Sequence, residues 1–68
     1  MKTISNYQQA KTTLKMYAIE MKKEHSTDKP MIRQLINDFT DYLCRSFSLT
    51  EHQRNLLSNY ACKLHPKD

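Results

Sequence analysis

The sequence predicts an all-α protein, a small antiparallel three-helix bundle that forms a single domain over residues 1–68. Three observations lead to this prediction. The chain has no Gly, Val or Trp, so the residues typical of sheets are scarce and the glycines of tight hairpin turns are missing. Apolar residues recur at helical spacing in three segments. Short polar segments separate them, and short connections place consecutive helices antiparallel.

The first predicted helix covers residues 6–25. Ser5 is followed three residues later by Gln8, which is the pattern of a capping box at a helix start. Apolar residues then recur at alternating spacings of three and four, and we predict that they form the buried face: Tyr7, Ala10, Leu14, Tyr17 and Met21. Polar cap-forming residues before Pro30 end this helix and begin the next one, since Pro is tolerated in the first turn of a helix.

The second predicted helix covers residues 30–46 and has the widest apolar arc. We expect this arc to face the core, with Phe39 at its centre: Ile32, Leu35, Ile36, Phe39, Tyr42, Leu43 and Phe47. On the polar side, Asp41 and Arg45 are four residues apart and therefore placed to form an ion pair. Cys44 falls at the flank of the arc, and we predict that both cysteines are free thiols on the flank or outer side of their helices.

The third predicted helix covers residues 51–64. Thr50 is its expected N-cap, with Gln53 as the partner in a capping box and Leu49 packing back from outside the helix. We expect His65 to end the helix, because the residue before a Pro avoids the helical conformation. The predicted inner face consists of Leu56, Leu57, Tyr60, Ala61 and Leu64.

Two apolar residues of the first helix, Met16 and Ile19, fall opposite its predicted buried face. One interpretation is ordinary surface, because isolated exposed apolar residues are common. The other is a contact surface, because Met adapts well at binding faces and a chain this short gains stability from association. We predict that this surface binds another protein or a second copy of the chain, as a homodimer. The surrounding lysines belong to it: Lys11, Lys15, Lys22 and Lys23.

The net charge of +4 raises the possibility of nucleic-acid binding. The second and third helices can be read as a helix-turn-helix, in which four polar residues of the third helix face outward and read base edges: Arg54, Asn55, Ser58 and Asn59. However, the second helix also exposes two Asp, and the positive excess lies in residues 1–27, with five Lys against two Glu. Lysines of this kind contact phosphates, so we expect any such binding to be weak.

Residues with the chemistry of catalysis or metal binding are present, but their spacing is wrong for either role. The residue types that bind zinc do not follow a known zinc pattern: Cys44, His52, Cys62 and His65. Paired carboxylates that would face a cleft are missing, and without Gly there is no Gly-rich phosphate-binding loop. We therefore expect no catalytic residues, no metal and no cofactor.

The expected location follows from the distribution of apolar residues and cysteines. No apolar run approaches the roughly 18 residues of a membrane span, and the first residues lack the apolar stretch of a signal peptide. With two cysteines, we expect a cytoplasmic protein. The sequence favours a small non-catalytic regulatory or adaptor protein that self-associates, by analogy with the small accessory regulators of bacteria, plasmids and phages. The alternative is a DNA-binding transcriptional regulator.

Overall fold

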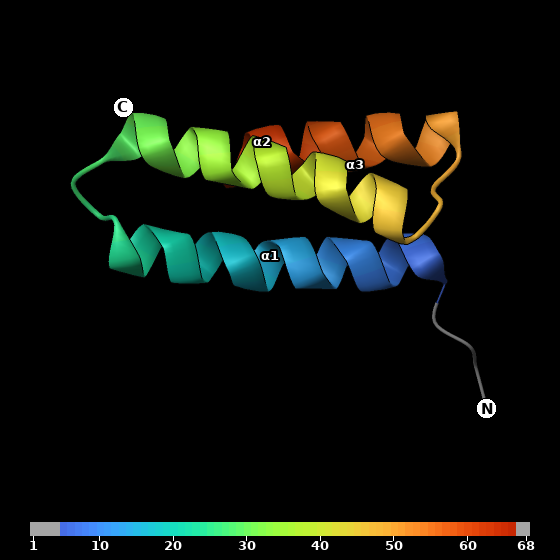
Figure 1. The fold of residues 1–68 in the computed structure, drawn as a ribbon, viewed down its shortest axis with the longest axis horizontal. Coiled ribbons are helices and arrows are strands. Elements are labelled where there is room, and N and C mark those ends of the chain that lie inside the picture. The colour runs from blue at the N-terminus through green and yellow to red at the C-terminus, as the bar shows by residue number, and fades with distance from the viewer. Residues whose placement is uncertain (1–4, 67–68) are drawn as a thin grey trace.

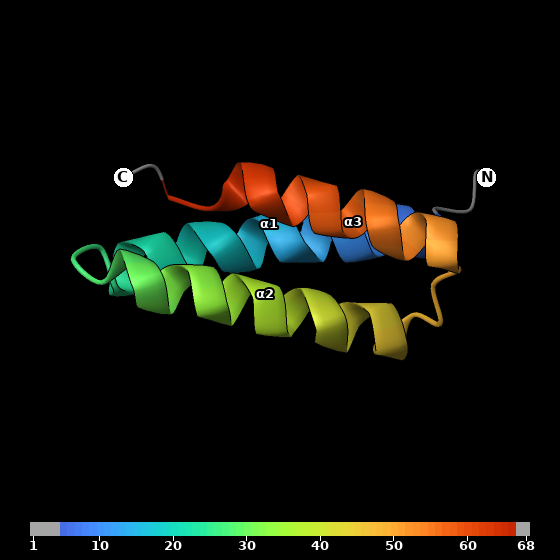
Figure 2. The same cartoon turned by 90° about the horizontal axis from the view of Figure 1, so that it is seen from above.

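The computed structural model describes residues 5–66, which form three helices: α1 (Asn6–Glu24), α2 (Lys29–Ser46) and α3 (Glu51–Leu64). Each helix runs antiparallel to the preceding one, and each packs against both others (Figure 1). Seen from above, α1 lies behind the line between α2 and α3, so the three helices occupy the corners of a triangle (Figure 2). The predicted fold class is confirmed, and the predicted helix boundaries are correct to within one residue.

Side chains cap the start of every helix. Ser5 and Asp28 each accept a hydrogen bond at 3.2 Å from the backbone N–H three residues later. At α3 the capping box is complete, because the Thr50 hydroxyl accepts from the Gln53 N–H at 3.2 Å and the Gln53 side chain accepts from the Thr50 N–H at 3.1 Å. These bonds satisfy backbone donors that have no partner within the helix, and they confirm the predicted starts.

The end of α2 is a Schellman motif that forms without glycine. The Leu49 N–H donates to the Cys44 carbonyl at 3.1 Å, and the Ser48 N–H donates to the Arg45 carbonyl at 3.3 Å, which is the pair of bonds that defines this motif. Ser48 occupies the position that usually holds Gly, and its φ of 50° lies in the left-handed region. The turn brings Leu49 back onto Cys44, and both side chains are buried.

We expect Ser48→Gly to raise the free energy of unfolding by about 0.5–1 kcal/mol. A residue with a Cβ pays roughly 1–2 kcal/mol for the left-handed conformation, and the greater flexibility of Gly in the unfolded chain offsets part of this gain. Urea denaturation would measure the change. The matched control is Ser46→Gly, which lies in the last turn of α2 and should lower the free energy of unfolding by about 0.5 kcal/mol. Equal losses in both variants would contradict the left-handed conformation of Ser48.

The core lies along the axis of the triangle and contains the most buried apolar side chains of the three helices and of the connection between α2 and α3: Ala10, Leu14, Ala18, Ile32, Ile36, Leu43, Cys44, Leu49, Leu57 and Ala61. In α1 the buried positions are four residues apart, with Leu14 between Ala10 and Ala18. Tyr7, Tyr17 and Met21, which we predicted on this face, are half-buried on its flanks. The small alanines let the neighbouring helices approach α1 closely.

Along α2 and α3 several side chains that we predicted to face the core are only partly covered: Leu35, Phe39, Tyr42, Phe47, Leu56, Tyr60 and Leu64. Tyr42 is 60% exposed and Leu56 is 40% exposed, so their assignment to inner faces was wrong. Phe39 is half-buried, and its ring stacks between the rings of Tyr17 and Tyr42, with centroid distances of 4.0 Å and 5.8 Å. The physical reason is geometric, because the apolar arc of α2 is wider than the strip that two neighbouring helices can cover.

Two side chains of α2 that were not among the predicted core residues are buried. Cys44, which we placed at the flank, is 6% exposed and packs in the core. Thr40 is also buried, and its hydroxyl donates to the Ile36 carbonyl at 2.7 Å, so that no polar atom of this side chain is left unsatisfied. The ion pair between Asp41 and Arg45 forms as predicted, on the exposed side of the helix.

Candidate protein-interaction surface

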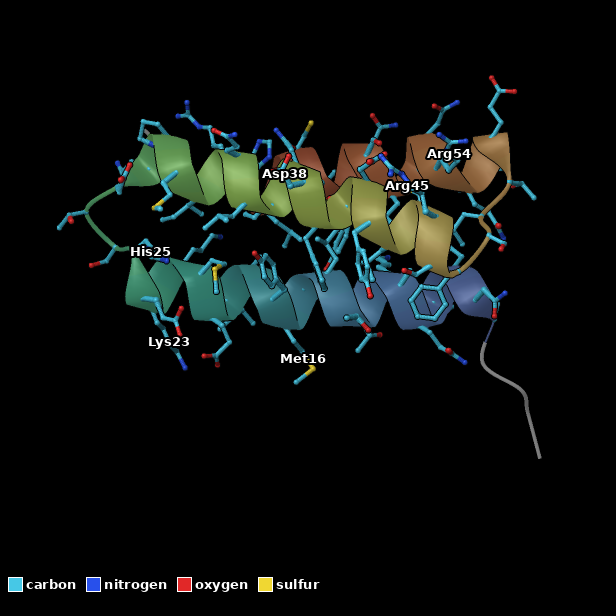
Figure 3. All side chains as sticks on the ribbon, viewed as in Figure 1. Met16, Lys23, His25, Asp38, Arg45 and Arg54 are labelled. Atoms are coloured by element: carbon cyan, nitrogen blue, oxygen red, sulfur yellow. The ribbon has the colours of Figure 1, made fainter. Side chains whose placement is uncertain are left out.

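The outer face of α1 carries two exposed apolar side chains, which we call the α1 ridge: Met16 and Ile19. Met16 is 64% exposed and Ile19 is 43% exposed. Figure 3 shows Met16 pointing away from the other two helices. The positions of Met16 and Ile19 follow from the helical period, because both residues lie roughly opposite Ala10, Leu14 and Ala18, which face the core. The structure thus places these two side chains where the sequence predicted them.

Two shallow grooves meet at Met16, and they carry opposite charges. The groove between α1 and α3 is lined by Gln8, Lys11, Thr12, Lys15, Met16, Ile19 and Tyr60. The groove between α1 and α2 is lined by Thr13, Met16, Tyr17, Glu20, Met21, Glu24 and Phe39. The ridge therefore has lysines on one side and glutamates on the other. Glu20 and Glu24 were not predicted as part of this surface, although Glu20 follows Met16 by four residues and this spacing places the two side by side.

The predicted lysines differ in what they contact. Lys15 lies beside Met16 and Ile19 in the groove between α1 and α3. The ammonium group of Lys11 lies 4.8 Å from the centre of the Tyr60 ring, so this lysine already makes a cation–π contact within the chain. Lys22 and Lys23 belong to the last turn of α1, where positive charge is favourable next to the helix C-terminus. Lys15 is thus the predicted lysine that borders the apolar ridge most directly.

Lys22 belongs to a positively charged region at the end of the bundle. There the His65 ring and Asn37 form a hydrogen bond of 2.9 Å between Nε2 and Oδ1, which links the end of α3 to α2. An amide oxygen can only accept, so the His65 Nε2–H is the donor. Partial burial lowers the pKa of His65, and the charges of Arg33 and Lys22 lower it further. Cations from α1 and α2 therefore act together on this end of α3.

The residues of the alternative nucleic-acid interpretation lie at a different groove, between α2 and α3. Arg54, Asn55 and Ser58 line it, together with Asp41 and Glu51, whose carboxylates repel phosphate groups. Asn59 is exposed elsewhere on α3. Moreover, α2 and α3 lie side by side and antiparallel in both views (Figures 1 and 2), whereas the helices of a helix-turn-helix cross at about 90–120°. The arrangement gives no support to a helix-turn-helix.

The same groove contains both cysteines, which are free thiols. Burial raises the pKa of the Cys44 thiol, and this effect exceeds the opposing effect of the nearby Arg54 guanidinium. A thiol with a raised pKa is a poor nucleophile and a poor metal ligand at neutral pH. Cys62 is exposed. Over residues 5–66, no three His, Cys, Asp or Glu side chains come close enough together to bind a metal ion.

Two further results bear on the class of protein. None of the three described helices is both long enough and apolar enough to span a membrane. Comparison of the chain with protein-family models, with curated proteins and with solved structures gives no match.

Proposed function

We propose that this chain is a small non-catalytic regulatory or adaptor protein that acts through protein–protein contacts, and that it self-associates through the α1 ridge. The observation that carries this proposal is the exposure of Met16 beside Ile19 on the outer face of α1. A domain of 68 residues buries a smaller fraction of its surface than a larger domain does, so covering an exposed apolar ridge is favourable. The alternative, a DNA-binding regulator, has less support because Asp41 and Glu51 lie among its proposed contact residues.

The test is the double variant Met16→Asp with Ile19→Lys, which leaves the net charge unchanged. Both side chains are exposed, so we expect the free energy of unfolding to change by no more than about 0.5 kcal/mol. Self-association should be lost, because an interface that buried an unpaired charge at each position would be strongly unfavourable. Sedimentation equilibrium of the wild type and the variant would measure the change, and circular dichroism would confirm that the variant is folded.

The matched control changes two exposed apolar residues on the other helices, Met31→Asp with Leu56→Lys. This variant removes similar apolar surface and also conserves net charge, so it should associate as the wild type does. Suppose instead that the wild type and the ridge variant are both monomeric and capture the same partners from a cell extract. The ridge would then be ordinary surface, and the proposal would be wrong.

A further inference from the structure

The α1 ridge has the residue pattern of a short coiled-coil seam. Met16 and Ile19 are three residues apart, as are the a and d positions of a heptad, and both are exposed. In this register Lys15 occupies the preceding g position and Glu20 the following e position. These two residues lie about 140° apart around the helix. The structure places them on opposite sides of Met16, Lys15 in the groove toward α3 and Glu20 in the groove toward α2.

This separation of charges distinguishes the two ways in which a second α1 can pack on the ridge. In a parallel pair the two-fold axis runs along the helices, so the lysine side of one copy faces the glutamate side of the other. A g residue then lies beside the e residue five positions later in the partner helix, and five is the separation of Lys15 and Glu20. In an antiparallel pair like sides face each other, so lysines meet lysines and glutamates meet glutamates.

We propose that the ridge is covered by a second copy of this chain, whose α1 packs parallel to the first. Met16 and Ile19 of both copies form the apolar seam, and Lys15 of each copy pairs with Glu20 of the other. This inference rests on the proposed function, because it names the partner and the geometry for the same ridge. The ridge is accessible for it, since α1 forms one side of the bundle and Met16 points outward (Figures 1 and 3).

The seam is short. In the same register Gln9 and Lys23 occupy the a positions before and after Met16, and Thr12 occupies the d position before Ile19. The apolar contact is therefore confined to the middle turns of α1, which places the interface at the small end of specific protein contacts. Because so little apolar area is buried, the two symmetric charge pairs decide whether the parallel or the antiparallel dimer forms. The polar a positions lower the affinity, and in the parallel pair the two Lys23 side chains face each other.

The experiment exchanges the charges at the two flanking positions. Lys15→Glu places a carboxylate against Glu20 of the second copy, and Glu20→Lys places an ammonium group against Lys15 of the second copy. Each single variant should therefore dimerise about tenfold or more weakly than the wild type. The double variant Lys15→Glu with Glu20→Lys restores opposite charges and should recover the wild-type affinity. An equimolar mixture of the two single variants should form a heterodimer, because both of its cross-pairs are then attractive.

Sedimentation equilibrium would give the dissociation constants, and native mass spectrometry would identify the heterodimer in the mixture. The matched control is Lys63→Glu, which makes the same change in net charge as Lys15→Glu on an exposed position of α3. It should dimerise as the wild type does. Circular dichroism would confirm that every variant is folded.

The outcomes separate this inference from the proposed function. Suppose that Met16→Asp with Ile19→Lys dissociates the wild-type dimer, but that Lys15→Glu alone does not weaken it. The parallel geometry is then wrong, because in an antiparallel pair this change only replaces one like-charge contact by another. A double charge variant that stays as weak as the single variants overturns the inference as well. A wild type that is monomeric at millimolar concentration, yet binds another protein through the ridge, overturns the inference and the self-association, and leaves standing the proposal that the chain acts by binding another protein through the ridge. Failure of both kinds of binding overturns both.

Discussion

Leu14→Ala is expected to lower the free energy of unfolding by about 2–5 kcal/mol, the range measured when a buried Leu is truncated in a packed core. Leu14 is fully buried on the inner face of α1, between Ala10 and Ala18. These neighbours are too small to fill the space that the missing side chain leaves. A domain of this size has a total stability of roughly 3–10 kcal/mol, so the variant would lose a large part of it. Urea denaturation followed by circular dichroism would measure the loss.

The control for this prediction is Met16→Ala on the opposite face of the same helix. Met16 is exposed, and Ala is at least as good a helix former, so the free energy of unfolding of the monomer should change by less than about 0.5 kcal/mol. Measurement at low protein concentration keeps self-association from contributing. A small effect at Leu14 together with a large effect at Met16 would mean that α1 is rotated about its axis relative to the structure.

Phe39→Ala is expected to lower the free energy of unfolding by about 2–3 kcal/mol. The half-buried ring contributes part of the transfer free energy of a Phe side chain, and its stacking on Tyr17, at a centroid distance of 4.0 Å, adds about 0.5–1.5 kcal/mol. Phe39→Leu should cost about 1 kcal/mol, because it keeps the apolar contact and loses only the ring stacking. Near-ultraviolet circular dichroism would report the loss of the stacked rings, and urea denaturation would report stability.

The measured loss also distinguishes between the two positions of Phe39: the centre of the core, which the sequence predicted, and the half-buried position in the structure. A Phe at the centre of a core costs about 3–5 kcal/mol when truncated to Ala, and a loss in the upper half of that range would favour full burial. A loss of less than about 1 kcal/mol would mean that the stack with Tyr17 and Tyr42 contributes little.

The helix boundaries could be predicted from the sequence because the signals that set them are local. Ser5, Asp28 and Thr50 each cap a helix with a bond to the backbone three residues away. His65 leaves the helical conformation because Pro66 follows it, and its ψ of 143° is extended. The end of α2 was also placed correctly, but its Schellman motif was not predicted, since Ser48 gives no glycine signal.

The buried face of α2 was predicted only in part, for a reason that is not local. Its apolar residues cover more than one side of the helix, and the sequence alone does not say which part of that arc the two neighbours cover. Tyr42 and Leu43 are adjacent in the chain, yet Tyr42 is exposed and Leu43 is buried. Cys44 and Leu49 are both buried, and the turn at Ser48 brings the Leu49 N–H back to the Cys44 carbonyl, which the apolar pattern of α2 does not reveal.

The candidate interaction surface was also predicted only in part, because some of its features depend on α1 alone and others depend on the neighbouring helices. The helical period places Met16 and Ile19 opposite the core, so their exposure could be predicted. The charges that flank them could not be assigned to grooves, because that requires knowing which side of α1 holds α2 and which holds α3. Tyr60 of α3 and Phe39 of α2 complete these grooves, and neither is near α1 in the sequence.

The two connections, residues 25–28 and 47–50, are four residues long, and their shortness has a consequence for how quickly the chain reaches this fold. Closing a short loop costs little entropy, and helices that follow each other in the chain meet without a long search. Bundles with such local contacts fold in microseconds to milliseconds. The apolar residues of this core are therefore exposed to other chains only briefly during folding, which limits aggregation of the newly made protein.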